Sequence, residues 1–168
     1  PEFLARDVKD GVLQVSSNGE FNYRLRDVHA RVSVIWNFEA PAGAGDTHFS
    51  IMRGTRANLV IRQGAEQKFK PVLYVEKAPS QTADAHEAAL KLAIAKVQEK
   101  HPGIGMRREG EVWVVTVPAS YDVGHEAHFA QVTEHFLRYL RAGRLPDWEV
   151  PNMITKYATI MQAYELSR

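Results

Sequence analysis

Apolar and polar residues alternate over much of the first half of the chain. From Val32 to Phe38 every second residue is apolar, which is the period-two pattern of a half-buried strand. Asn18-Gly19 predicts a tight hairpin turn between the first two strands. Similar alternation, or enrichment in β-branched and aromatic residues, predicts strands at 12–15, 21–25, 28–38, 48–52, 57–63 and 70–76. The order of these strands indicates an antiparallel meander.

The hydrophobic period becomes helical after residue 80. Asp84 and Glu87 have the spacing of a capping box at a helix start, and His101-Pro102-Gly103 predicts the end of that helix. A strand follows at 111–117, closed by a proline. Apolar residues recur at helical spacing in three segments, 84–100, 125–141 and from Pro151 onward.

Strands followed by helix, strand and two helices are typical of the α+β class. We therefore expect a mostly antiparallel open β-sheet with about three helices packed on one face. If the strands at 70–76 and 111–117 are neighbours and parallel, the helix between them should make a right-handed crossover.

Composition narrows the class of protein. A chain of 168 residues that is 45% hydrophobic is long enough for a single domain with its own core. The formal net charge of +1, with scattered arginines, does not favour nucleic-acid binding, and no apolar run is long enough to cross a membrane. The absence of cysteine excludes disulfides and thiolate metal sites. Because the chain starts at Pro1 without a methionine or a signal-peptide pattern, we expect it to be part of a longer protein. Any targeting segment would then lie upstream, so the location is unknown, with the cytoplasm favoured.

Polar side chains follow the Pro/Gly-rich loop at 40–45. Asp46 and His48 are two residues apart, so on a strand they would point to the same side. An Asp–His pair can orient an imidazole for proton transfer or contribute metal ligands. The simpler interpretation is that Asp46 caps the loop and His48 is half-buried on the sheet. It is favoured, because two residues alone are a weak signal for a site.

Arginines are frequent on the next two predicted strands. Arg53 and Arg62 could bind a carboxylate, a phosphate or sugar hydroxyls through their guanidinium groups. Alternatively, they pair with glutamates such as Glu76 on neighbouring strands, which is the commoner role of an arginine on a sheet.

Two motifs suggest sites but lack the required spacing. His125 and His128 are three residues apart, whereas a zinc-binding helix places its histidines at i and i+4, so no metal site is predicted. Lys77 lies in Val75-Glu76-Lys77-Ala78-Pro79, but no G-x-G-x-x-G precedes it, and Gly43-Ala44-Gly45 lacks the third glycine. No cofactor site is therefore expected in this chain. The tryptophans are expected to be structural, with Trp36 and Trp113 in the core and Trp148 holding a loop onto the domain.

Four stretches together resemble the C-terminal domain of an oxidoreductase family in the glucose–fructose oxidoreductase, inositol dehydrogenase and MocA superfamily. They include the phrases GDTH-x-S-x-MRGT and WEVPNM, and the resemblance covers nearly the whole chain. The stretches are WNFEAPAGAGDTHFSIMRGTRANLVIRQG, KPVLYVE, VPASYDVGHEAHF and LPDWEVPNMITKYATIMQAY. Such proteins pair an N-terminal Rossmann domain with an α+β domain whose sheet closes the substrate pocket and often builds the oligomer interface.

The resemblance implies that residues 1–168 form a single substrate-side and oligomerisation domain, without the N-terminal Rossmann domain. The superfamily's catalytic lysine and Asp-x-x-x-His pair are also missing, since Asp46 and His48 have a different spacing. No catalytic residue is therefore carried over.

The resemblance favours the C-terminal domain of an NAD(P)-dependent oxidoreductase acting on a small-molecule sugar or polyol, inactive alone. NAD or NADP would bind to the chain's own N-terminal domain, and the sheet would form a homo-oligomer contact. The substrate-binding candidates are Asp46, His48, Arg53, Arg62 and Tyr74. The alternative is a stand-alone ligand-binding or scaffolding module, since fold does not determine function. A self-sufficient hydrolase is the weakest hypothesis, because no G-x-S-x-G motif or clear carboxylate pair is present.

Overall fold

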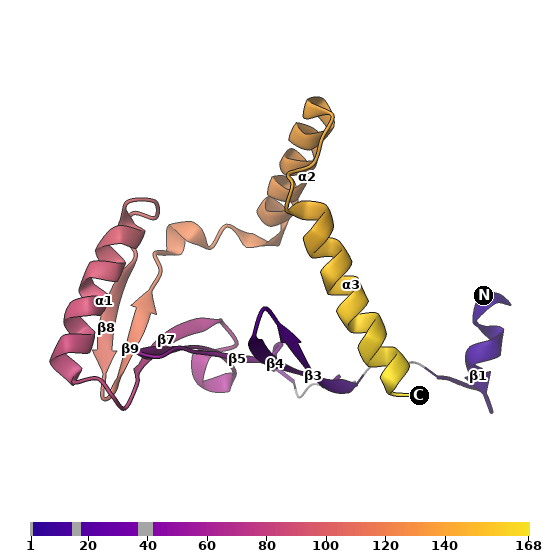
Figure 1. Ribbon diagram of the computed structural model, residues 1–168, viewed down its shortest axis with the longest axis horizontal. Coiled ribbons are helices and arrows are strands. Elements are labelled where there is room, and N and C mark those ends of the chain that lie inside the picture. The colour runs from indigo at the N-terminus through magenta and orange to yellow at the C-terminus, as the bar shows by residue number, and fades with distance from the viewer. Residues whose placement is uncertain (1, 15–17, 37–41) are drawn as a thin grey trace. The chain divides into compact units, whose positions relative to one another are not determined.

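The computed structural model describes residues 2–14, 18–36 and 42–168. The chain divides into two compact units (Figure 1). One comprises 1–39 and 130–168, and the other comprises 40–129. The division falls inside helix α2 (Gly124–Ala142).

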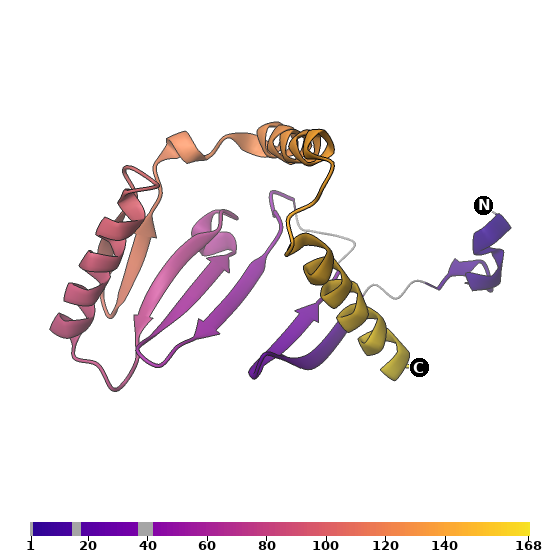
Figure 2. The ribbon, with the colours of Figure 1, turned by 45° about the horizontal axis from the view of Figure 1, so that its top comes forward.

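The second unit contains a five-stranded sheet in the order β5-β6-β7-β9-β8 (Figure 2). Every neighbouring pair in this sheet is antiparallel. Helix α1 (Ala83–Gln98) connects β7 to β8, and short 3-10 turns occur at η2 (Ala65–Gln67) and η3 (Ala119–Tyr121). The strands are β5 (His48–Arg53), β6 (Ala57–Gln63), β7 (Val72–Lys77), β8 (Gly105–Glu109) and β9 (Val112–Thr116).

The register defines two faces of this sheet, because directly paired residues point to the same side. Tyr74 pairs with Val60 on one neighbour and with Val114 on the other, and these three residues define the Tyr74 face. Trp113 pairs with Val75 and with Arg108, and these define the Trp113 face.

Helix α1 packs against the Trp113 face. His86 on this helix lies against Trp113 with ring centroids 4.7 Å apart. The core of the unit includes Val60, Val75, Trp113 and Val114, and Trp113 is only 1% exposed. The prediction that Trp113 is a core residue is therefore confirmed.

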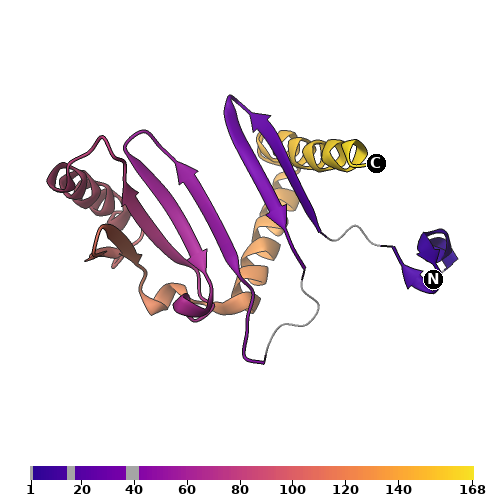
Figure 3. The same cartoon turned by 90° about the horizontal axis from the view of Figure 1, so that it is seen from below.

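The first unit contains two separate hairpins, α3 and the larger part of α2. Among the described residues, β1 pairs only with β2, and β3 pairs only with β4 (Figure 3). Its elements are η1 (Glu2–Asp7), β1 (Val8–Lys9), β2 (Val12–Leu13), β3 (Gly19–Leu25), β4 (Val28–Val34), the larger part of α2, and α3 (Glu149–Leu166).

The expected α+β class is confirmed: the described residues form antiparallel sheets and three α-helices. The sequence did not predict that the strands divide into three sheets. Strand β8 was not predicted, so the strand–helix–strand prediction for 70–117 was incomplete. Strands β7 and β9 are neighbours but antiparallel, so the conditional prediction of a right-handed parallel crossover does not apply. The charged sequence GMRRE of β8 has no apolar alternation, which is common for an edge strand.

The predicted hairpin at Asn18-Gly19 is wrong. The turns that close the two hairpins are Asp10-Gly11 and Arg26-Asp27. All four residues have positive φ, between 47° and 76°, as a two-residue hairpin turn of type I′ requires. Asp10-Gly11 carried a usable turn signal, whereas Arg26-Asp27 did not.

Two other local predictions need correction. Helix α1 is capped by Thr82, whose Oγ1 accepts a hydrogen bond from the Ala85 N–H at 3.3 Å, so Asp84 lies in the first turn. Trp36 is 64% exposed and is not a core residue of its unit. The predicted end of its strand, Phe38, lies outside the described residues.

Candidate functional site

Three polar side chains form a connected cluster on the Tyr74 face. Arg62 is two residues from Val60 on β6, and Glu76 is two residues from Tyr74 on β7, so all three share this face. The Arg62 Nη2 donates to Glu76 Oε1 at 3.0 Å, and its guanidinium carbon lies 5.0 Å from the centre of the Tyr74 ring. Arg62 therefore crosses the phenol ring to reach its carboxylate partner.

Gln67 adds a fourth member to this cluster. It ends η2, the short connection between β6 and β7, and its Nε2 donates to the Tyr74 hydroxyl at 3.1 Å. Gln67 was not predicted from the sequence, because a single helical turn has no periodicity. Its position in the connection between two strands that carry candidate residues was the available signal. The site is the set Arg62, Gln67, Tyr74 and Glu76, named here the Arg62–Tyr74 cluster.

Arg53 shares the Tyr74 face but lies at the far end of β5. It pairs with Asn58, whereas Arg62 pairs with Phe49. Four residues of strand correspond to about 13 Å. Arg53 is level with Glu76, two strands away through Asn58, so it lies beside the Arg62–Tyr74 cluster, and none of the described contacts joins it to the cluster.

His48 points away from the cluster. It pairs with Gln63 and belongs to the Trp113 face. Its Nε2 lies 3.1 Å from Ser50 Oγ on the same strand. Asp46 precedes β5, and its backbone oxygen accepts a hydrogen bond from Gln63 Nε2 at 3.0 Å. Of the five candidates from the sequence, the structure brings only Arg62 and Tyr74 into contact.

The cluster can exchange hydrogen bonds with a polar ligand. It contains a permanent cation, a carboxylate, an amide and a phenol, and these offer both donors and acceptors. Within 2–14, 18–36 and 42–168, no group of three His, Asp or Glu side chains could hold a metal ion. The donors and acceptors of the cluster suit hydroxyl, carbonyl or carboxylate oxygens.

His86 is the buried ionisable side chain of this unit. It is 5% exposed, and no hydrogen-bond partner for its Nε2 is present in the described structure. Burial lowers the pKa of His86 below its ordinary value, and the positive charge of Lys77 lowers it further. His86 is consequently a neutral core residue in the folded protein, on the face opposite the cluster.

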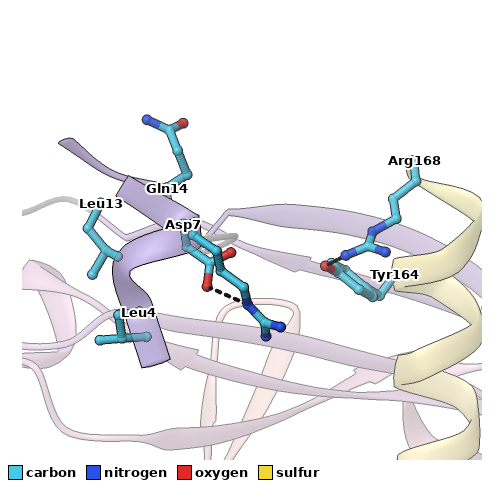
Figure 4. A pocket seen from close by; sticks show the side chains of 7 residues that line it. Leu4, Asp7, Leu13, Gln14, Tyr164 and Arg168 are labelled. Atoms are coloured by element: carbon cyan, nitrogen blue, oxygen red, sulfur yellow. Dashed lines mark hydrogen bonds and ion pairs between the residues drawn. The ribbon is translucent and has the colours of Figure 1, made fainter. Parts of the chain in front are cut away.

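A shallow hollow in the other unit lies between the N-terminal segment and the end of α3 (Figure 4). Arg6 pairs with Asp7 at 3.5 Å, and Arg168 contacts the Tyr164 hydroxyl and ring. Each of these contacts lies within one wall of the hollow. We assign no site there.

Within the described residues, the junction between β7 and α1 does not fit a dinucleotide. Among the described elements, the strand that leads directly into a helix is β7, and its junction to α1 is Ala78-Pro79-Ser80-Gln81-Thr82. This junction contains no glycine, and the sheet around it is antiparallel, whereas a dinucleotide site needs a glycine-rich turn between parallel strands.

The comparisons with known proteins define the family. The chain matches the family described as "Putative oxidoreductase C terminal domain" over residues 1–168, so it belongs to that family. It also resembles the crystal structure of a putative oxidoreductase from Parabacteroides merdae ATCC 43184, with 51% identity and a TM-score of 0.90. The match covers 98% of this chain and 38% of that chain. No curated protein matches the chain.

Family membership confirms the expected assignment of this chain to a family of oxidoreductase C-terminal domains. The chain spans little more than a third of the length of the similar structure. Within the described residues, no helix has the length and apolar character needed to cross a membrane.

Proposed function

We propose that this chain is the substrate-side and assembly domain of an NAD(P)-dependent oxidoreductase that acts on a sugar or polyol. In the intact protein a hydride would move between the nicotinamide of NAD or NADP and a secondary alcohol carbon, with the redox chemistry carried by the cofactor. This chain would supply substrate contacts and subunit contacts, and it would be inactive alone. The proposal includes membership of the glucose–fructose oxidoreductase, inositol dehydrogenase and MocA superfamily.

The Arg62–Tyr74 cluster carries the substrate part of the proposal. Sugars and polyols are recognised by side chains that donate and accept hydrogen bonds beside an aromatic ring. Arg62 and Glu76 offer a charged donor and acceptor, and Tyr74 offers a ring and a hydroxyl. Helix α1 packs on the opposite face, and although Val60 and Val114 of this face are buried, the side chains of Arg62 and Glu76 remain 44% and 27% exposed.

Apolar surface supports the assembly part of the proposal. Val132, Phe136 and Leu140 recur at helical spacing on α2 and are 60–66% exposed within the described structure. On edge strand β5, Phe49 on the Tyr74 face and Met52 on the Trp113 face are also well exposed. Large exposed apolar side chains gathered on one element mark contact surfaces. We propose that β5 and its sheet contribute a homo-oligomer contact and that the helices contribute contacts to the N-terminal domain.

Calorimetric titration with NAD(H) and NADP(H) tests whether the cofactor binds outside residues 1–168. We expect binding to the intact protein and none to residues 1–168 alone. A second experiment tests the substrate site. Dehydrogenase activity of the intact protein is measured on a panel of sugars and polyols, with Arg62→Ala as the site variant. Arg53→Ala is the control, because Arg53 shares the face but lies outside the cluster.

The outcomes separate the parts of the proposal. Cofactor binding by residues 1–168 alone would contradict the assignment of the nucleotide site to another domain. Equal loss of activity in Arg62→Ala and Arg53→Ala would contradict the assignment of the substrate site to the cluster. If the intact protein binds no cofactor, the chain is a ligand-binding or scaffolding module.

A further inference from the structure

The hydrogen bond between Gln67 and Tyr74 has a defined direction. A side-chain amide nitrogen can only donate, so the Tyr74 oxygen is the acceptor in the 3.1 Å contact. The proton of the Tyr74 hydroxyl must therefore point away from Gln67. Among the described residues, no acceptor for this proton is present.

Arg62 presents further donors at the same place. Its Nη2 is engaged by Glu76, while its guanidinium carbon lies 5.0 Å from the centre of the Tyr74 ring. A guanidinium carries five N–H donors, so those not directed at Glu76 remain for a ligand. The cluster thus offers two kinds of donor, a phenol O–H and a guanidinium N–H.

We propose that Gln67 is a positioning residue that holds Tyr74 as a hydrogen-bond donor, so that Tyr74 and Arg62 recognise an acceptor oxygen of the substrate. The substrate class is then a sugar or polyol derivative with a carboxylate or carbonyl group. A hydroxyl group satisfies this site less well, because it is neutral and one of its hydrogen-bonding positions is a donor. The inference rests on the proposed function, since it assumes that the cluster contacts substrate.

Two matched probes test the inference on the intact protein. D-Gluconate and D-sorbitol differ at one end of the molecule, which is a carboxylate in the first and a CH₂OH group in the second. Dissociation constants for both are measured by calorimetry. We expect wild-type protein to bind gluconate about 10-fold or more tightly than sorbitol, as a charge-assisted hydrogen bond implies.

Gln67→Leu removes the donor to Tyr74 while keeping a side chain of similar size. We expect this variant to bind gluconate about 3- to 10-fold more weakly, with little change for sorbitol and only a small decrease in the melting temperature. Tyr74→Phe should lose the same preference. Because Gln67 acts through the Tyr74 hydroxyl, Gln67→Leu should have no further effect in a Tyr74→Phe background.

Gln67→Glu reverses the hydrogen bond, since a carboxylate accepts the Tyr74 proton. This variant should lose the preference for gluconate more completely than Gln67→Leu. Gln63→Glu is the charge control, because it adds the same charge at the end of β6 but belongs to the opposite face. We expect Gln63→Glu to keep most of the preference.

The outcomes distinguish this inference from the proposed function. Binding of both probes with no effect of Gln67→Leu on their ratio would overturn the role of Gln67 and leave the proposed function intact. An additive effect of Gln67→Leu in the Tyr74→Phe background would also overturn it. Failure of wild-type protein to bind either probe, or any other sugar or polyol of the activity panel, would overturn both.

Discussion

The imidazole of His86 lies against the indole of Trp113, with ring centroids 4.7 Å apart and ring planes inclined by 59°. This contact joins α1 to β9, and both side chains are almost completely buried. The charged form of an imidazole is costly to bury, so this junction depends on the neutral form of His86. Two different properties of the five-stranded unit follow from the pair, its response to pH and its response to loss of the indole.

The stability of the five-stranded unit should fall at acidic pH because of His86. Its folded pKa is lowered by burial and by Lys77, so around and below 6.5 the unfolded chain binds more protons than the folded chain. The free energy of unfolding should therefore decline as the pH falls through 6.5. Below the folded pKa of His86, this residue should cause no further decline. Urea unfolding between pH 8 and pH 5 measures this dependence. His86→Phe should remove this part of the pH dependence, whereas His125→Gln, which alters an exposed histidine, should keep it; equal curves for wild type and His86→Phe would contradict the prediction.

Trp113→Ala should destabilise the same unit by about 3–5 kcal/mol, because a large side chain that is 1% exposed leaves a cavity. Trp36→Ala is the matched control, since Trp36 is 64% exposed, and we expect it to change stability by about 0.5 kcal/mol or less. Urea unfolding, monitored by far-UV circular dichroism, gives both values without relying on tryptophan fluorescence. Similar losses for the two variants would show that Trp36 is covered in the protein in solution.

Gly54→Ala should weaken the turn between β5 and β6. A Cβ at residue 54 would lie 2.8 Å from the backbone oxygen of Ala57, which accepts the Gly54 N–H hydrogen bond. Relief of that clash must move backbone, and we expect a cost of about 1–3 kcal/mol. Gly19→Ala is the control, because a Cβ there has no neighbour within 4 Å. Hydrogen exchange of β5 and β6 peptides reports the local loss, and unchanged protection in Gly54→Ala would contradict the prediction.

Thr82→Ala should remove the N-cap of α1 at a cost of about 1 kcal/mol, because the Ala85 N–H loses its acceptor. Asp84→Ala should cost less, since Asp84 acts only through its charge in the first turn. Chemical denaturation compares the two variants directly. A larger effect of Asp84→Ala would restore the capping box predicted from the sequence.

Local sequence patterns predicted the elements of the five-stranded unit well, with the exception of β8. The strand at 57–63 has the predicted bounds, and β5 and β9 begin or end within one residue of the predicted positions. Helix α2 was also placed within one residue at each end. Alternation and helical periodicity report which side of an element meets a core, so they identify elements whose neighbours are apolar.

Other features depended on pairing between segments that are distant in sequence. Trp36 and Trp113 lie in similar β-rich patterns, yet only Trp113 is covered, because it pairs within a wide sheet and contacts α1. Arg26-Asp27 forms a hairpin turn without glycine, since the long pairing of β3 with β4 stabilises its positive φ values. Neither outcome follows from local sequence alone.

The candidate site also combines features that local sequence predicted with features that only strand pairing decided. Residue chemistry in the sequence identified Arg62 as a candidate, and the family resemblance added Tyr74. The sequence also excluded disulfides and thiolate metal sites, and it contains no G-x-G-x-x-G turn. Only the tertiary structure placed His48 on the opposite face, separated Arg53 from Arg62 and added Gln67 through η2. The physical reason is that a side chain's type is local, whereas its face and its partners are set by the register between strands.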